Sequence, residues 1–320
     1  MAYEIKLCDV IKTLCFCVLD PFVFYRSKAS FVQRLGSSLD VNGLAVCCNR
    51  IFLTGISSTE IEVYDAVSFR QLQTLTVSVM TDPWDIAASP SHPNLYIFEG
   101  LHQLLRLDPC GRIVTSWTLD GDQCSLSVSR TNSVIVTYSD RLEEFNSVGT
   151  ILRSTTLDRT VCHASHSVRI NSETLMVCHG SGRVSIPHSV CLIDSDGRIM
   201  DRYQESGGCT YQPLYLAVAD HGSVLVADVH GRRVQIVHRN LRQSYDLIST
   251  VGTQNGWPLR VCYDSPRGNV YVCTLDGNVL VYQIRTRDWP RTECLDVHSG
   301  LIPGELTDVE YDFGYELEEE

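Results

Sequence analysis

Lysine is almost absent from this sequence of 320 residues, because its only three lysines are Lys6, Lys12 and Lys28. Basic residues as a whole are also scarce: acids outnumber bases by 38 to 26, and the formal net charge is −12. This balance argues against binding of nucleic acid or anionic membrane through bulk electrostatics. The composition, 44% hydrophobic with 21 glycines, lacks the bias of collagen, coiled coils or disordered chains. We therefore expect a folded globular protein.

Long apolar runs are missing as well. Near the N-terminus the longest uncharged apolar run covers residues 13–19, bounded by Lys12 and Asp20, and is too short for a secretory signal. No stretch approaches the length of about 18 apolar residues that a membrane span requires. We expect a cytoplasmic protein without membrane contact.

The sequence contains 14 cysteines but no Cys-x-x-Cys pair. Cys15 with Cys17, and Cys47 with Cys48, lack the spacing of a zinc knuckle. Most cysteines lie in apolar, strand-like runs, where a thiol acts as a small apolar side chain: Cys47, Cys178, Cys191, Cys262 and Cys273. Reduced core cysteines are therefore a better interpretation than a disulfide framework.

A repeat of about forty residues is present instead. Short apolar segments recur along the chain, and their second residues lie at positions 44, 86, 126, 168, 216 and 259. After about ten residues each segment is followed by a run rich in β-branched and aromatic residues, as at residues 51–54 and 224–227. A third run then alternates between apolar and polar residues, as at residues 61–64. Each repeat therefore predicts at least three strands.

Turn signals predict a fourth strand in each repeat. Residues 108–111, 146–149 and 194–197 each place Asp or Asn first and Gly last, as hairpins need, and a short apolar run follows. No amphipathic helix separates the strands. Six units of four antiparallel strands bury both sheet faces when they pack around an axis. The predicted fold is all-β, a six-bladed β-propeller of four-stranded antiparallel blades.

The ends of the chain set the predicted domain boundaries. We expect an N-terminal extension over residues 1–30, the propeller over 31–303 and an acidic tail over 304–320. Residues 31–35 would serve as the outer strand of the sixth blade and close the ring, with residues 292–297 as the rival candidate. The tail contains eight acids and no base, and we expect it to be disordered, with an acidic motif for a basic groove as the alternative.

The fifth repeat resembles a known family. In residues 223–237 a strand ends in Ala227-Asp228, a short turn follows, and the next strand begins at Arg233. This pattern resembles the hallmark of NHL repeats, and residues 31–290 resemble the NHL propeller of tripartite-motif ubiquitin ligases. The resemblance implies a non-catalytic, substrate-recognising scaffold linked to a ubiquitin-ligase system. The RING finger and B-boxes of that family, with their paired Cys and His, are absent.

The resemblance gives the missing lysines a second interpretation. Lysine amines accept ubiquitin, whereas arginine keeps the charge without offering an acceptor. From residue 29 onward the chain has 22 arginines and no lysine. A codon bias of the genome explains this absence more simply, and shielding from ubiquitin stays the alternative.

The predicted propeller loops hold the candidate partner-binding residues. Loops that enter the first strand of each blade, and loops between the second and third strands, open on the same face. Arginine and aromatic residues, which suit protein hot spots and also single-stranded RNA, occur there at Trp84, Arg141, Arg159, Arg183, Tyr211, Arg232, Arg233 and Trp257. Acids occur in the same loops at Glu60, Asp82, Asp85, Asp122, Asp140, Asp158, Glu205 and Asp276. The mixed charge favours a protein or peptide partner over RNA; alternatively, the tryptophans pack between blades and the arginines pair with these acids.

Histidines offer a different hypothesis, an enzyme with a metal in the propeller channel, as in lyases or lactonases of this fold. The best set is His163, His166, His179 and His221. Their spacing is not that of a local metal site, and no nucleophile-elbow motif accompanies the serines. We therefore expect no catalysis, no metal and no cofactor.

Overall fold

The computed structural model describes residues 28–90, 92–100, 102–121, 123–180, 188–204, 211–249 and 256–284. All of these residues belong to one compact unit. Within the described ranges the regular structure is β-strand, apart from one short 3-10 turn, η1 (Asp220–Gly222). None of the described segments forms a helix that is long and apolar enough to cross a membrane.

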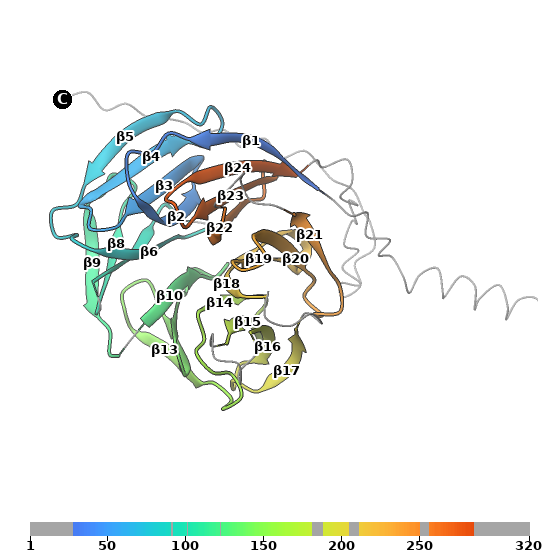
Figure 1. The fold of residues 1–320 in the computed structure, drawn as a ribbon. Helices are drawn as coiled ribbons and strands as arrows, with labels where there is room; N and C mark the ends of the chain where they lie inside the picture. The colour runs from blue at the N-terminus through green and yellow to red at the C-terminus, as the bar shows by residue number, and fades with distance from the viewer. Residues whose placement is uncertain are drawn as a thin grey trace, which may run out of the picture. The chain divides into compact units, whose positions relative to one another are not determined.

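The strands form six sheets of four antiparallel strands, as the repeat predicts. The first strands of the six blades are β2 (Val41–Cys47), β6 (Pro83–Ala88), β10 (Gln123–Val128), β14 (His166–Arg169), β18 (Pro213–Val218) and β22 (Pro258–Asp264). Each of these inner strands contacts the inner strands of the blades on both sides. They therefore surround a central channel, and Figure 1 shows the blades following one another around it in sequence order.

The remaining strands continue each blade outward. The second strands are β3 (Arg50–Gly55), β7 (Leu95–Glu99), β11 (Val134–Tyr138), β15 (Thr174–His179), β19 (Val224–Asp228) and β23 (Asn269–Thr274). The third strands are β4 (Glu60–Asp65), β8 (Gln103–Leu107), β12 (Arg141–Phe145), β16 (Ser189–Asp194), β20 (Arg233–Val237) and β24 (Val279–Ile284). The outer strands are β5 (Gln71–Thr76), β9 (Ile113–Thr118), β13 (Ile151–Thr156), β17 (Ile199–Tyr203), β21 (Ser244–Ile248) and β1 (Ala29–Leu35).

The N-terminal strand closes the ring, which confirms the first of the two predicted closures. Strand β1 pairs antiparallel with β24, from Ala29 opposite Ile284 to Leu35 opposite Val279. The ring of Phe31 meets that of Tyr282 edge to face, with 5.7 Å between their centroids. The rival strand at 292–297, the extension before residue 28 and the acidic tail lie outside the described residues.

The core of the propeller lies between the blades. Six clusters of buried apolar side chains occur, and each joins two successive blades around the ring. In the cluster between the first two blades, for example, Phe52 and Val63 of one blade pack with Ile86 and Ile97 of the next. Each sheet therefore buries both faces, which explains why the middle of its second strand is a continuous apolar run.

The predicted turns between third and outer strands are also present. Asp108, Asn146 and Asp194 each accept backbone N–H bonds from two residues further along their own turn. The glycine at the end of each turn has a positive φ, as at Gly149 with φ 89°. A Cβ on Gly149 would lie 2.8 Å from the ring of Trp117 on the preceding blade. The turn glycines thus serve both the hairpin and the packing of neighbouring blades.

Candidate functional site

Polar side chains form a belt around the channel, near the start of the inner strands. In five blades a β-bulge follows the first residue of the inner strand. The residues directly after these bulges are Gly43, Asp85, Ser125, Tyr215 and Arg260. We refer to Asp85, Tyr215 and Arg260, together with His166 of the remaining blade, as the channel belt.

His166 takes the position that Asp85 has two blades earlier. The carboxylate of Asp85 accepts the backbone N–H of Leu126, on the inner strand of the following blade, at 3.0 Å. His166 Nδ1 accepts the backbone N–H of Leu216, again on the following blade, at 3.2 Å. Both side chains therefore fasten their own inner strand to the next one.

Arg260 is the buried cation of the belt. Its Nε lies 3.3 Å from Asp85 Oδ1, and its Nη2 donates to the carbonyl of Trp84 at 3.3 Å. The Tyr215 hydroxyl donates to Asp85 at 3.3 Å, and the Arg260 guanidinium lies 4.8 Å from the Tyr215 ring centroid. Burial raises the pKa of the Asp85 carboxyl, while Arg260 and the backbone N–H of Leu126 oppose that rise. The belt thus joins blades two, five and six across the channel.

His166 is held as a neutral imidazole. Because Nδ1 accepts a backbone hydrogen bond, Nε2 is the protonated nitrogen, and it donates to the carbonyl of Leu126 at 3.3 Å. The ring also stacks on Tyr215, with 3.6 Å between centroids. Burial, and secondarily Arg260, lowers the pKa of His166 to about 3. With both nitrogens bonded to backbone, His166 positions strands and has no nitrogen left for a metal or a substrate.

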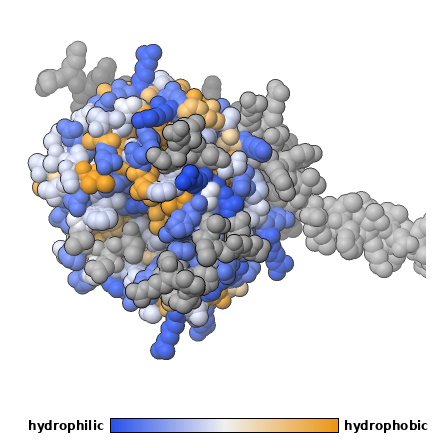
Figure 2. Space-filling view, in the orientation of Figure 1, coloured by the Kyte–Doolittle hydropathy of each residue, from blue (hydrophilic) through white to orange (hydrophobic). Residues whose placement is uncertain are grey.

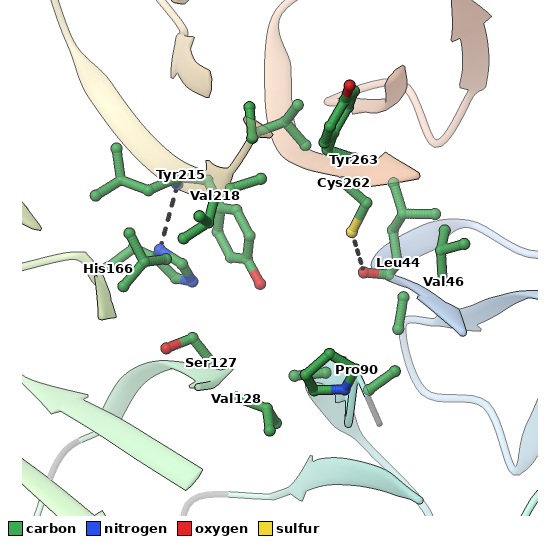
Figure 3. A pocket seen from close by; sticks show the side chains of 18 of the residues that line it. Leu44, Val46, Pro90, Ser127, Val128, His166, Tyr215, Val218, Cys262 and Tyr263 are labelled. Carbon is green, nitrogen blue, oxygen red and sulfur yellow. Dashed lines mark hydrogen bonds between the residues drawn. The ribbon is translucent and has the colours of Figure 1, made fainter. Parts of the chain in front are cut away.

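Beside the belt, the channel holds a cavity of about 290 Å³. Its walls are mostly aliphatic residues of the inner strands, such as Leu44, Val128 and Val218, and Figure 3 shows these side chains around the open space. Further lining residues, Arg130 and Tyr263 among them, lie at or beyond the ends of the inner strands. The cavity therefore extends from the belt toward the loops that join first and second strands. These loops and the turns between third and outer strands form what we call the turn face, and the opposite side is the loop face.

The loop face exposes two of the predicted tryptophans. Trp84 is 53% exposed and Trp257 is 38% exposed. Arg232 is exposed, and its guanidinium lies 5.5 Å from the Trp257 ring centroid. The backbone carbonyl of Trp257 accepts the backbone N–H of Leu275 at 2.9 Å. The loops that carry Trp257 and Leu275 therefore lie side by side. The structure thus brings Trp257, Arg232 and Leu275 together.

Three further aliphatic side chains are exposed in loops of this face. Ile56, Val79 and Leu275 are each about half exposed. With Trp84, Trp257 and Arg232 they form what we call the loop-face patch. Its apolar members lie on or beside blades one, two and six, whose inner strands are neighbours in the ring. Figure 2 shows one face of the propeller, on which apolar residues (orange) interrupt the polar surface near the centre of the ring.

Of the remaining predicted residues, one is exposed and two are not available to a partner. Arg159 is exposed, as expected, whereas Arg141 lies 3.7 Å above the Tyr138 ring and pairs with Glu143 at 3.0 Å. Tyr211 is only 3% exposed because it packs between blades four and five. Its ring therefore belongs to the core and offers no surface to a partner in this conformation. Arg183 lies outside the described residues.

Arg233 has a structural role within blade five. Its Nε donates to Asp228 Oδ2 at 2.8 Å, and Asp228 itself is fully buried. Asp228 Oδ1 also accepts the backbone N–H groups of Gln212 and Gly231. The Asp and Arg of the sequence pattern at 223–237 thus lock the turn between the second and third strands, while the neighbouring Arg232 points to solvent.

The histidines of the metal hypothesis have different surroundings where their side chains are described. His163 is exposed, whereas His179 is buried and contacts the Ser189 hydroxyl at 2.6 Å and Cys191 Sγ at 3.1 Å. The side chain of His221 lies outside the described residues. Among the described residues no group of three His, Cys, Asp or Glu side chains is placed to hold a metal.

Asp85, Tyr215 and Arg260 gave no clear signal in the sequence. Asp85 was expected in an exposed loop, but it lies on β6 and is fully buried. The available signal was positional for two of them, because Asp85 and Tyr215 each lie at the start of the apolar run that opens their repeat, whereas Arg260 comes after the position aligned in the sixth repeat. Only a comparison of all six apolar segments would have revealed a charged or aromatic residue at that position.

Comparison with known proteins supports the fold alone. No family model and no curated protein matches the sequence. A solved streptogramin B lyase superposes with TM-score 0.60 and 12% identity, over 82% of this chain and all of that one. Virginiamycin B lyase from Staphylococcus aureus gives 0.58 and 10%, over 81% of this chain and all of that one. Hydrazine synthase from Kuenenia stuttgartiensis gives 0.55 and 15%, over 75% and 82%. The chain is a six-bladed β-propeller that shares its fold with proteins of very different sequence.

Proposed function

We propose that this propeller is a non-catalytic scaffold that binds a protein or peptide partner through its loop-face patch. The exposure of Trp84 and Trp257 on one face, with Arg232 beside Trp257, carries this proposal. Tryptophan and arginine are enriched among residues that dominate protein interfaces. Exposed apolar patches of this kind mark interaction sites on soluble proteins.

A catalytic role has less support from the channel. The belt contains an acid, a base and a phenol, but its members already bond to one another or to backbone. Such contacts favour a role in fastening blades. Metal analysis of the purified protein tests this reading, and a stoichiometric metal that EDTA removes together with an activity would overturn it.

Photo-crosslinking in cells tests the scaffold proposal directly. A benzoylphenylalanine at Leu275 lies in the loop-face patch, while the same group at Val67 lies in a turn of blade one on the turn face as a matched control. We expect a discrete protein adduct from position 275 that is absent from position 67. No adduct, or the same adduct from both positions, would contradict a partner on the loop face. An adduct with RNA would favour the RNA alternative.

The resemblance to NHL propellers supports a finer version of the proposal. In it, the partner is a substrate of a cytoplasmic ubiquitin ligase whose catalytic domain lies on another chain. This version expects the crosslinked partner to accumulate when the propeller is depleted. An unchanged abundance and ubiquitin content of that partner would refute the link and leave the scaffold role untouched.

A further inference from the structure

An arginine-rich groove crosses the turn face over blades two to four. Two cavities of about 330 Å³ and 410 Å³ adjoin there, since Thr131 and Glu144 line both. The charged residues that line them are Arg106, Arg130, Arg153, Arg169 and Glu144. Four guanidinium groups against one carboxylate give these walls a formal charge of +3, in a chain whose net charge is −12.

Two of these arginines have no partner in the described protein. Arg130 and Arg153 are exposed and make no hydrogen bond or ion pair with any described residue. Glu144, the only acid among the described lining residues, already pairs with Arg169 at 2.5 Å and accepts a short hydrogen bond from Ser133. The cationic charge of Arg130 and Arg153 is therefore available to a ligand.

The other two arginines are held in place by the protein. Arg106 donates to the Ser147 carbonyl at 3.0 Å and to Asn94 Oδ1 at 3.3 Å, and Arg169 donates to the Ser172 carbonyl at 3.1 Å. In both side chains the Nε is buried and has no acceptor. A buried donor without an acceptor is costly unless a ligand or water supplies one. These fixed arginines add preorganised positive charge to the groove.

We propose that this groove binds an acidic peptide segment of a partner protein in an extended conformation. Arginine matches carboxylate geometry with paired hydrogen bonds. The groove runs over three blades, and an extended peptide, which advances by about 3.3 Å per residue, spreads its carboxylates over such a length. Leu152, 58% exposed in the same cavity wall, offers an apolar contact. Single-stranded RNA binds by stacking its bases on several rings in succession, and the described lining residues offer it one exposed ring, that of His92, because Tyr96 is fully buried.

Fluorescence polarisation with labelled hexaglutamate tests the proposal on the intact protein. We expect saturable binding at low ionic strength that weakens as salt is added, and no binding of labelled hexaglutamine. Replacing both free arginines, Arg130→Ala with Arg153→Ala, should weaken binding at least about tenfold, because each loses a charge-assisted contact. A matched control, Arg239→Ala with Arg242→Ala, removes two exposed arginines of the turn in blade five and should change affinity by less than about twofold.

Three results would overturn the proposal. One is the absence of saturable hexaglutamate binding, and another is an equal loss of affinity in both double variants, which would indicate bulk charge. The third is displacement of the peptide by oligouridylate that binds more tightly, which would assign the groove to nucleic acid. Trp84→Ala with Trp257→Ala should leave hexaglutamate binding unchanged. The proposals for the groove and for the loop-face patch are therefore tested independently.

Discussion

Acidification should destabilise this propeller through His166. The imidazole is neutral in the folded protein, where its pKa is lowered from 6.5 to about 3. In the unfolded chain it has its ordinary pKa and takes up a proton as the pH falls through 6.5. The unfolded state then binds more protons than the folded state, so the free energy of unfolding decreases from about pH 6.5 down to about pH 3.

The magnitude follows from the separation of the two pKa values. One pKa unit corresponds to about 1.4 kcal/mol, so at pH 5 the cost of keeping His166 neutral is about 2 kcal/mol. That is a large share of the roughly 5 to 15 kcal/mol by which domains are stable. Other groups titrate in the same range. Burial raises the pKa of Asp85, so its protonation increases the free energy of unfolding as the pH falls, opposite to the effect of His166. The comparison must therefore be made against a variant that lacks only the imidazole.

Urea unfolding at pH 7 and pH 5, followed by tryptophan fluorescence, measures this contribution. His166→Asn keeps an acceptor for the Leu216 N–H but cannot titrate. We expect the wild type to lose about 2 kcal/mol more than His166→Asn between these pH values. The control His163→Asn removes an exposed imidazole at a positive φ of 54°, which Asn tolerates. An equal loss in the wild type and His166→Asn would refute the neutral, buried state of His166.

Three further predictions concern stability; denaturant unfolding measures the substitutions, and thermal unfolding with light scattering measures the deletion. Arg233→Ala should cost about 3 kcal/mol because it leaves the buried Asp228 without its cation, whereas Arg232→Ala should cost under about 0.5 kcal/mol; equal costs would contradict the two assignments. Deletion of residues 1–36 removes β1 and exposes the edge of β24, so we expect a sharp fall in the melting temperature or aggregation, and a deletion variant as stable as the full chain would rule out this closure. Gly149→Ala, at φ 89°, should cost about 1 to 3 kcal/mol, while Gly36→Ala, with open space around it, should be nearly neutral.

The architecture followed from the sequence because the forty-residue repeat fixes it. The middle residues of the second strands are buried between blades and are therefore recognisable as continuous apolar runs. The turns were predictable because Asp108 and Gly111 stand at positions where only a few residue types satisfy the backbone. Even the closing strand could be placed, since the sixth unit had three strands of its own and needed a fourth.

The site was less predictable because the pattern of a loop says little about where its side chains point. Arg232 and Arg233 are adjacent, yet the side chain of Arg232 is exposed and that of Arg233 pairs with the fully buried Asp228. Tyr211, two residues before β18, was likewise expected in a loop but packs into the core between blades four and five. The belt was missed because Asp85 and Arg260 are 175 residues apart and meet only when the ring is closed.

Titration of the partner identified by crosslinking tests the central claim most directly. Isothermal titration calorimetry would compare the wild type with Trp84→Ala/Trp257→Ala and with the control Val67→Ala/Leu72→Ala, which removes two exposed apolar side chains of blade one outside the loop-face patch and the groove. If the loop-face patch is the binding surface, the tryptophan variant should lose at least about 2 kcal/mol, or roughly thirtyfold in Kd, and the control should match the wild type. Unchanged affinity in a correctly folded tryptophan variant would contradict the account.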